Sequence, residues 1–208
     1  LDARFLGPSE LPPTRRAELT AAFEALRRAA GVAAELQFRS GGSFGPNALA
    51  LPDGTILVTD ALVELAGDDR EVLAVLAHEL GHVHGRHGLR AILQNSGAAL
   101  VLAAVFSDLV SLTSSAVVLP TVLLQSGYSR DLEREADAFA LALLEEADLD
   151  PAWFARILGR LQALGDAGPS LLSTHPHAAE RRTAALRMAR DPTLGEPGQA
   201  VEPVRSES

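Results

Sequence analysis

The pentapeptide His78-Glu79-Leu80-Gly81-His82 constrains this chain more than any other feature of its sequence. Residues four positions apart lie on one face of an α-helix, so both imidazoles can reach a single ion. Apolar neighbours such as Val75, Leu76 and Ala77 indicate that this helix is buried. Two histidines and a glutamate on a buried helix need a shared partner, and a metal ion satisfies all three.

The spacing of this pentapeptide is typical of zinc hydrolases. Zinc lowers the pKa of a bound water to about 7 and polarises a carbonyl group. Glu79 is offset by one residue from His78 and faces the same cavity, where it can accept the proton of that water and pass it to a leaving amine. We therefore predict one Zn²⁺ ion per chain, with His78 and His82 as ligands and Glu79 as general base.

A catalytic zinc site also needs a third protein ligand and an open position. His87 fits the related pattern HExxHxxGxxH poorly: Gly85 matches the glycine, but the last histidine of that pattern falls on Gly88. His84 lies two residues from His82 and points to another face, so we expect a solvated histidine at the helix end.

A second helix, predicted at residues 129–147, offers carboxylates instead. Glu133 and Asp137 are four residues apart and share a face. We predict that Glu133 is the third ligand and that Asp137 accepts the Nδ1 proton of a ligating histidine, a contact that orients the ring. Glu135 points elsewhere and is expected to be a solvated charge.

The remaining pattern predicts an α+β fold that is mostly helical, with a small β-sheet beside the active-site helix. A capping box of Asp68 and Glu71 indicates the start of that helix, which ends near residue 85. Strands expected at 36–39, 48–51 and 55–59 would form a small antiparallel sheet. Other helices are expected at 14–30, 151–164 and 178–190. We interpret 1–13 as a leader or linker, 14–190 as the domain and 191–208 as a disordered tail.

Composition excludes several classes of function. The 208 residues carry a net charge of −9 with scattered basic residues, and aromatic residues make up 4%, so a nucleic-acid partner is not expected. The chain has no cysteine, which excludes disulfides, Cys-ligated zinc and thiol nucleophiles. Because it begins at Leu1, we expect a processed product or an excised piece of a longer protein.

Residues 97–126 form an apolar stretch with two interpretations. One is a buried helical hairpin that covers the catalytic helices, and the other is a hairpin that dips into a membrane. Asp108 and many hydroxyl groups favour the first, because they are costly in lipid. Membrane association through this stretch or through a missing N-terminal region stays open. We expect a cell-envelope location, membrane-associated or periplasmic, with the cytoplasm as the alternative.

Three separated motifs resemble one known family. HELGH at 78–82, SRDLEREADAFA at 129–140 and STHPHAAERRTAAL at 173–186 occur in the order found in the M48 family of gluzincin metallopeptidases. Residues 47–59 resemble the stretch before that family's active-site helix, and the similarity covers about residues 45–190. The family includes prenyl proteases with many membrane-spanning helices. This sequence lacks such a set of helices, so prenylated substrates are not expected.

The resemblance implies a zincin fold and endoproteolysis of peptide or unfolded protein substrates, in protein quality control at the cell envelope. It supports Glu133 as ligand and Asp137 as its neighbour. It further implies that His175 stabilises the oxyanion near the scissile carbonyl without binding zinc, and that Arg181 braces the site. Substrate would lie extended along an exposed strand. A zinc-binding pseudoprotease is the rival interpretation, which the presence of Glu79 disfavours; a latent enzyme with a blocked cleft is another.

Overall fold

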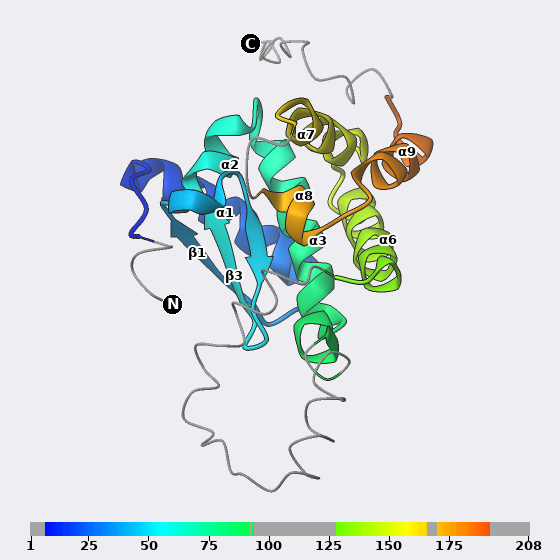
Figure 1. Cartoon of the computed structure of the whole chain (residues 1–208), viewed down its shortest axis with the longest axis horizontal. Coiled ribbons are helices and arrows are strands. Elements are labelled where there is room, and N and C mark those ends of the chain that lie inside the picture. Colours follow the sequence, from blue (N-terminus) through cyan, green and yellow to red (C-terminus); the bar gives the residue numbers. More distant parts are fainter. Residues whose placement is uncertain (1–6, 92, 94–127, 166–169, 192–208) are drawn as a thin grey trace, which may run out of the picture.

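The computed structural model of the chain describes residues 7–91, 93, 128–165 and 170–191. It has the predicted α+β architecture, mostly helical, with a small sheet beside the long central helix α3 (Figure 1). The elements are α1 (Pro13–Ala30), β1 (Glu35–Arg39), η1 (Gly42–Phe44), β2 (Ala48–Ala50), β3 (Thr55–Thr59), α2 (Asp60–Leu65), α3 (Asp69–His84), α6 (Arg130–Glu146), α7 (Ala152–Ala163), α8 (Leu171–Thr174) and α9 (Ala178–Met188). The five longest, α1, α3, α6, α7 and α9, are the predicted helices; α2, α8 and η1 were not expected.

The sheet corrects one expectation. Its strand order is β1-β3-β2, and β1 pairs with β3 in parallel, so the sheet is mixed and not antiparallel. The chain does reverse direction from strand to strand, as predicted. However, β2 does not lie next to β1, because residues 40–47 lead the chain past the position of β3. The turn at 51–54 then places β3 between β1 and β2. The three-residue β2 is left on the edge of the sheet.

Helix α3 is the core of the molecule. All of its residues from Glu71 to His82 are buried, and it packs against α1, α6, α7 and the sheet. Its fourth-from-last residue, Gly81, lets α6 approach closely, because a Cβ there would lie 2.8 Å from the backbone oxygen of Ala136. The glycine of the pentapeptide thus sets the distance at which α6 presents its carboxylates to α3.

The predicted capping box at the start of α3 is only half formed. The Asp68 side chain accepts a bond from the backbone N–H of Arg70 at 2.9 Å. Glu71 does not bond back to Asp68: it accepts from the N–H of Gly67, and it is buried beside the guanidinium of Arg160 at 2.9 Å. Burial of Glu71 against basic side chains of α7 takes it away from the cap.

Among the described residues, no helix combines the length and the apolar character needed to cross a membrane. The stretch 97–126 lies outside the described residues, as do residues 1–6 of the predicted leader and all of the predicted tail after residue 191. Both interpretations of 97–126, and the predicted domain boundaries, therefore stay predictions.

Candidate metal centre

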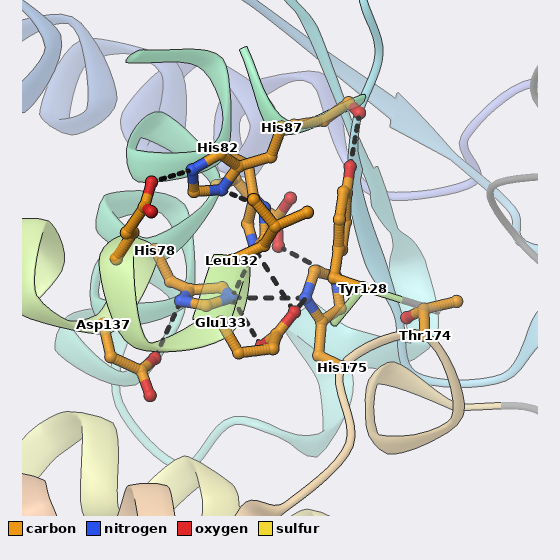
Figure 2. A network of polar contacts seen from close by, with 12 residues as sticks. His78, His82, His87, Tyr128, Leu132, Glu133, Asp137, Thr174 and His175 are labelled. Carbon is orange, nitrogen blue, oxygen red and sulfur yellow. Dashed lines mark hydrogen bonds and ion pairs between the residues drawn. The ribbon is translucent and has the colours of Figure 1, made fainter. Parts of the chain in front are cut away.

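Four buried side chains from three parts of the chain converge beside α3. His78 and His82 come from α3, Glu133 from α6, and His175 from the residue that follows α8. Each offers one donor atom, and these atoms all lie within 4.8 Å of one another (Figure 2). Residues almost a hundred positions apart in sequence thus form one cluster of metal-ligating groups.

The spacing within this cluster fits a tetrahedral ion. The Nε2 atoms of His78 and His82 are 2.9 Å apart. The two oxygens of Glu133 lie 3.5 Å from these nitrogens, Oε2 from His78 and Oε1 from His82. Zinc held tetrahedrally at about 2.0–2.1 Å separates its donor atoms by about 3.3 Å. The observed separations are close to this value, so these three side chains could hold one ion; the ligand set itself stays a prediction.

His175 lies inside the cluster. Its Nδ1 is 2.9 Å from Oε1 of Glu133 and 3.2 Å from Nε2 of His78, and its Nε2 is 3.5 Å from Oε1 of Glu79. By distance, Nδ1 could serve as a fourth ligand, whereas Nε2 faces the general base. The expectation that His175 acts without binding the metal stays a prediction.

The environment of Glu79 is a further sign that a cation fits this site. Its side chain is buried, and neither carboxylate oxygen has a hydrogen-bond partner within the described part of the chain. A buried carboxylate without hydrogen bonds carries a large desolvation cost. A bound cation together with its water would supply the missing partners, so the residues present fit a metal ion.

Asp137 and Arg181 support the cluster from the side of α6 and α9. Asp137 Oδ1 lies 3.0 Å from Nδ1 of His78 (Figure 2). Arg181 is buried and contacts Asp137 at 2.8 Å, Oε2 of Glu133 at 2.9 Å and the backbone oxygen of His175 at 3.3 Å. One guanidinium therefore links both carboxylates of α6 to the loop that carries His175.

The electrostatics of the cluster favour an added cation. Burial and the charge of Arg181 lower the pKa of His78, but hydrogen bonds to Asp137 and Glu133 outweigh them and raise it to about 9. Burial and the neighbouring imidazoles hold the pKa of His82 well below its usual range. Burial alone would raise the pKa of Glu133, but its contacts with His175 and His78 have the larger effect, so the pKa lies below its usual range. A metal ion bound to His78 would have to compete with a proton for the ring.

Two residues that the sequence analysis set aside reach the site. His87 is buried, with Nδ1 3.0 Å from Nδ1 of His82 and Nε2 3.1 Å from Oε2 of Glu135. Glu135 is exposed, as expected for a solvated charge, but its carboxylate also bonds to His87 and Arg90. By contrast, His84 is exposed at the end of α3 and stacks on the Phe139 ring.

Tyr128 was also missed. Its ring stacks on His82 with centroids 4.0 Å apart, and its hydroxyl donates to the backbone oxygen of Ala50 in β2 at 3.4 Å (Figure 2). Tyr128 precedes the second predicted helix, so helical periodicity could not predict its position. The available signal was that it is the one tyrosine in the chain.

Known proteins resemble the chain over most of its length. The model of peptidase family M48 matches residues 13–189. Curated relatives include the mitochondrial metalloendopeptidase OMA1 of Arabidopsis thaliana, 35% identical over 140 residues, and the metalloprotease LoiP of Escherichia coli, 32% identical over 140 residues. A beta-barrel assembly-enhancing protease of Escherichia coli is 27% identical over 156 residues. These alignments cover 65%, 65% and 69% of this chain, but 28%, 55% and 32% of the respective relatives.

Proposed function

The chain belongs to peptidase family M48, and from this premise we propose that it is a zinc-dependent endopeptidase acting on protein substrates. The observation that carries the proposal is the buried cluster of His78, His82 and Glu133. Beside it lies the carboxylate of Glu79, which accepts no hydrogen bond from the described residues. The three ligands would hold the ion, and a bound zinc ion supplies acidified water and a polarised scissile carbonyl.

Within this site, Glu79 has the role of general base. Its carboxylate accepts the proton of the attacking water and delivers it to the leaving amine, as its buried position without hydrogen bonds allows. His175 directs Nε2 toward the same space, at 3.5 Å from Glu79. A proton on Nε2 would be donated to the oxygen on which negative charge develops. Asp137 and Arg181 orient His78 and Glu133 and touch no reacting atom.

The substrate in this proposal is an extended segment of an unfolded protein. Strand β2 lies on the edge of the sheet, and an edge strand can hold peptides of varied sequence through backbone hydrogen bonds. Tyr128 already bonds to Ala50 of that strand, next to His82. We also propose a role in protein quality control at the cell envelope. It is supported by the similarity to a beta-barrel assembly-enhancing protease.

The test is proteolysis of an unfolded substrate such as casein, together with metal analysis. Glu79→Gln should lower turnover by about 10²–10⁴ and keep its zinc, because an amide cannot accept the proton. His82→Ala and Glu133→Ala should lose zinc at limiting metal, while the exposed His84→Ala is the matched control. Activity of Glu79→Gln within about tenfold of wild type would contradict the role of general base. Full zinc in His82→Ala or Glu133→Ala would contradict the ligand assignment.

His175 is tested in the same assay. If it donates a hydrogen bond in the transition state, His175→Ala should lower kcat by about 10²–10³ with little change in KM or zinc content. Loss of zinc from this variant would make His175 a ligand. Unchanged turnover would leave it with no catalytic role.

A further inference from the structure

His82 has a second ring nitrogen that the proposed mechanism does not use. Its Nε2 faces the metal cluster, 2.9 Å from Nε2 of His78. Its Nδ1 faces away, 3.0 Å from Nδ1 of His87, and His87 in turn places Nε2 3.1 Å from a carboxylate oxygen of Glu135. Two imidazoles and a carboxylate thus form a chain that runs from the ion site to the surface.

The protons in this chain can be ordered in only one way that leaves His82 free to bind a metal. A neutral imidazole has one N–H and one acceptor nitrogen. If Nε2 of His82 binds an ion, its proton must be on Nδ1, and the bond to His87 then requires an acceptor at Nδ1 of His87. The proton of His87 is consequently on Nε2, where the carboxylate of Glu135 accepts it.

We propose that His87 is a positioning residue for His82. It holds His82 in the tautomer that presents Nε2 to the metal, and the hydrogen bond to Glu135 at the surface holds His87 in place. The inference rests on the proposed metal site. In this proposal His87, supported by Glu135, accepts the Nδ1 proton of His82, just as Asp137 accepts the Nδ1 proton of His78. Hydrogen bonds of this kind orient a ligating ring and raise its basicity.

The turn after α3 places the His87 ring against His82. Helix α3 ends at His84, Arg86 then adopts a left-handed backbone conformation with φ of 50°, and helix resumes at residue 87. This turn directs the His87 ring back toward α3. A Cβ at Gly85 would lie 2.1 Å from Nε2 of His87, so only glycine leaves space for the ring.

The contacts on both sides agree with this order of protons. The carboxylate of Glu135 accepts from Arg90 and can accept from Nε2 of His87 as well. Tyr128 stacks on the His82 ring with an angle of 27° between the planes and limits its rotation.

The hydrogen bond can be tested without metal. In metal-free protein labelled with ¹⁵N at its six histidines, NMR should detect a coupling across an N–H···N bond between Nδ1 of His82 and Nδ1 of His87. The proton should reside on the His82 nitrogen, and His87 should be the Nε2–H tautomer. A protonated Nε2 on His82, or no coupling between the two rings, would overturn the proposal.

Zinc affinity tests the positioning role. His87→Ala should weaken binding by about 10–100-fold, measured by competition with a chromophoric chelator. His87→Gln should bind more tightly than His87→Ala, because its amide can accept from His82 and donate to Glu135. The matched control His84→Ala removes a histidine from the same helix end and should bind as wild type does. Wild-type affinity in His87→Ala would overturn the inference, whereas absence of zinc binding by the wild type would overturn the proposed function.

Discussion

The two histidines of α3 lie one turn apart, yet they are supported in different ways. Nδ1 of His78 meets a buried carboxylate directly, at 3.0 Å from Asp137, and Arg181 neutralises that carboxylate. Nδ1 of His82 contacts the ring of His87, and a carboxylate follows only behind that ring, on the side chain of Glu135, which is 52% exposed. One support is a buried ion pair and the other is a relay that ends in solvent.

This difference predicts two kinds of consequence. A buried ion pair is part of the folded structure whether or not a metal is bound, and removal of one partner leaves an uncompensated charge in the interior. A relay that ends at the surface is screened by water and holds little folding energy, so its effect is confined to the ring that it orients. We therefore expect Asp137 and Arg181, which support His78, to govern stability. We expect His87 and Glu135, which support His82, to govern metal affinity.

Arg181→Ala is expected to have the largest effect. The variant leaves the carboxylates of Glu133 and Asp137 buried together without their cation, so the metal-free protein should lose about 3–5 kcal/mol of unfolding free energy. Saturating zinc should restore part of this loss, because the ion replaces the missing positive charge. Urea unfolding with and without zinc measures both.

The control for this variant is Arg134→Ala. Arg134 pairs with Glu180 at 2.8 Å, but both side chains are about half exposed. Its loss should change stability by about 0–1 kcal/mol. Equal losses in the two variants would mean that Arg181 stabilises the fold no more than an exposed ion pair does, and the comparison between the two supports would fail.

Asp137→Asn is expected to come next. The amide oxygen can still accept the proton of His78, but the negative charge that raises the basicity of the ring is gone. Zinc affinity should fall by about 10–100-fold. Glu135→Gln makes the same change at the exposed end of the relay. Its loss of zinc affinity should lie near the lower end of that range, at about tenfold. Chelator competition on both variants ranks them, and a larger loss in Glu135→Gln would reverse the comparison.

The side of His78 could be predicted from the sequence, because helical geometry alone relates its parts. Spacing of four residues placed His78 with His82 and Glu133 with Asp137, and α3 and α6 bring the two pairs together. The side of His82 could not be predicted in this way. His87 reaches the site through a left-handed turn at Arg86, and no periodicity describes a turn.

The fold shows the same division. Helices with long amphipathic patterns were predicted to within a few residues, because each pattern reports one buried face. The pairing of β1 with β3 was not predicted, since strand patterns fix the faces of a sheet but not its neighbours. His175 and Arg181 lie beyond α7, and only the packing of α9 on α6 brings Arg181 to Glu133. Their place at the site was inferred from the resemblance to the family.

Gly85→Ala sharpens the comparison at the turn itself. Alanine suits the backbone of Gly85, whose φ is −75°, so the only conflict is with the His87 ring. Zinc affinity should fall about tenfold, at the lower end of the range expected for His87→Ala, while urea unfolding of the metal-free protein should change little. The double variant Gly85→Ala/His87→Ala should be no worse than either single variant, because both disrupt the same contact. Additive losses would mean that Gly85 acts through something other than His87.

Arg90→Ala is expected to have the smallest effect and tests where the relay ends. Arg90 bonds to both oxygens of Glu135, at 2.5 and 3.2 Å, but its side chain is 42% exposed. Exposed pairs of this kind contribute about 0–1 kcal/mol, so zinc affinity should change by about fivefold at most. Because salt screens exposed charges, the difference from wild type should shrink as ionic strength rises toward about 1 M. Chelator competition at low and high salt measures this. A salt-independent loss as large as that of His87→Ala would place Arg90 inside the relay and extend the support of His82 to a third residue.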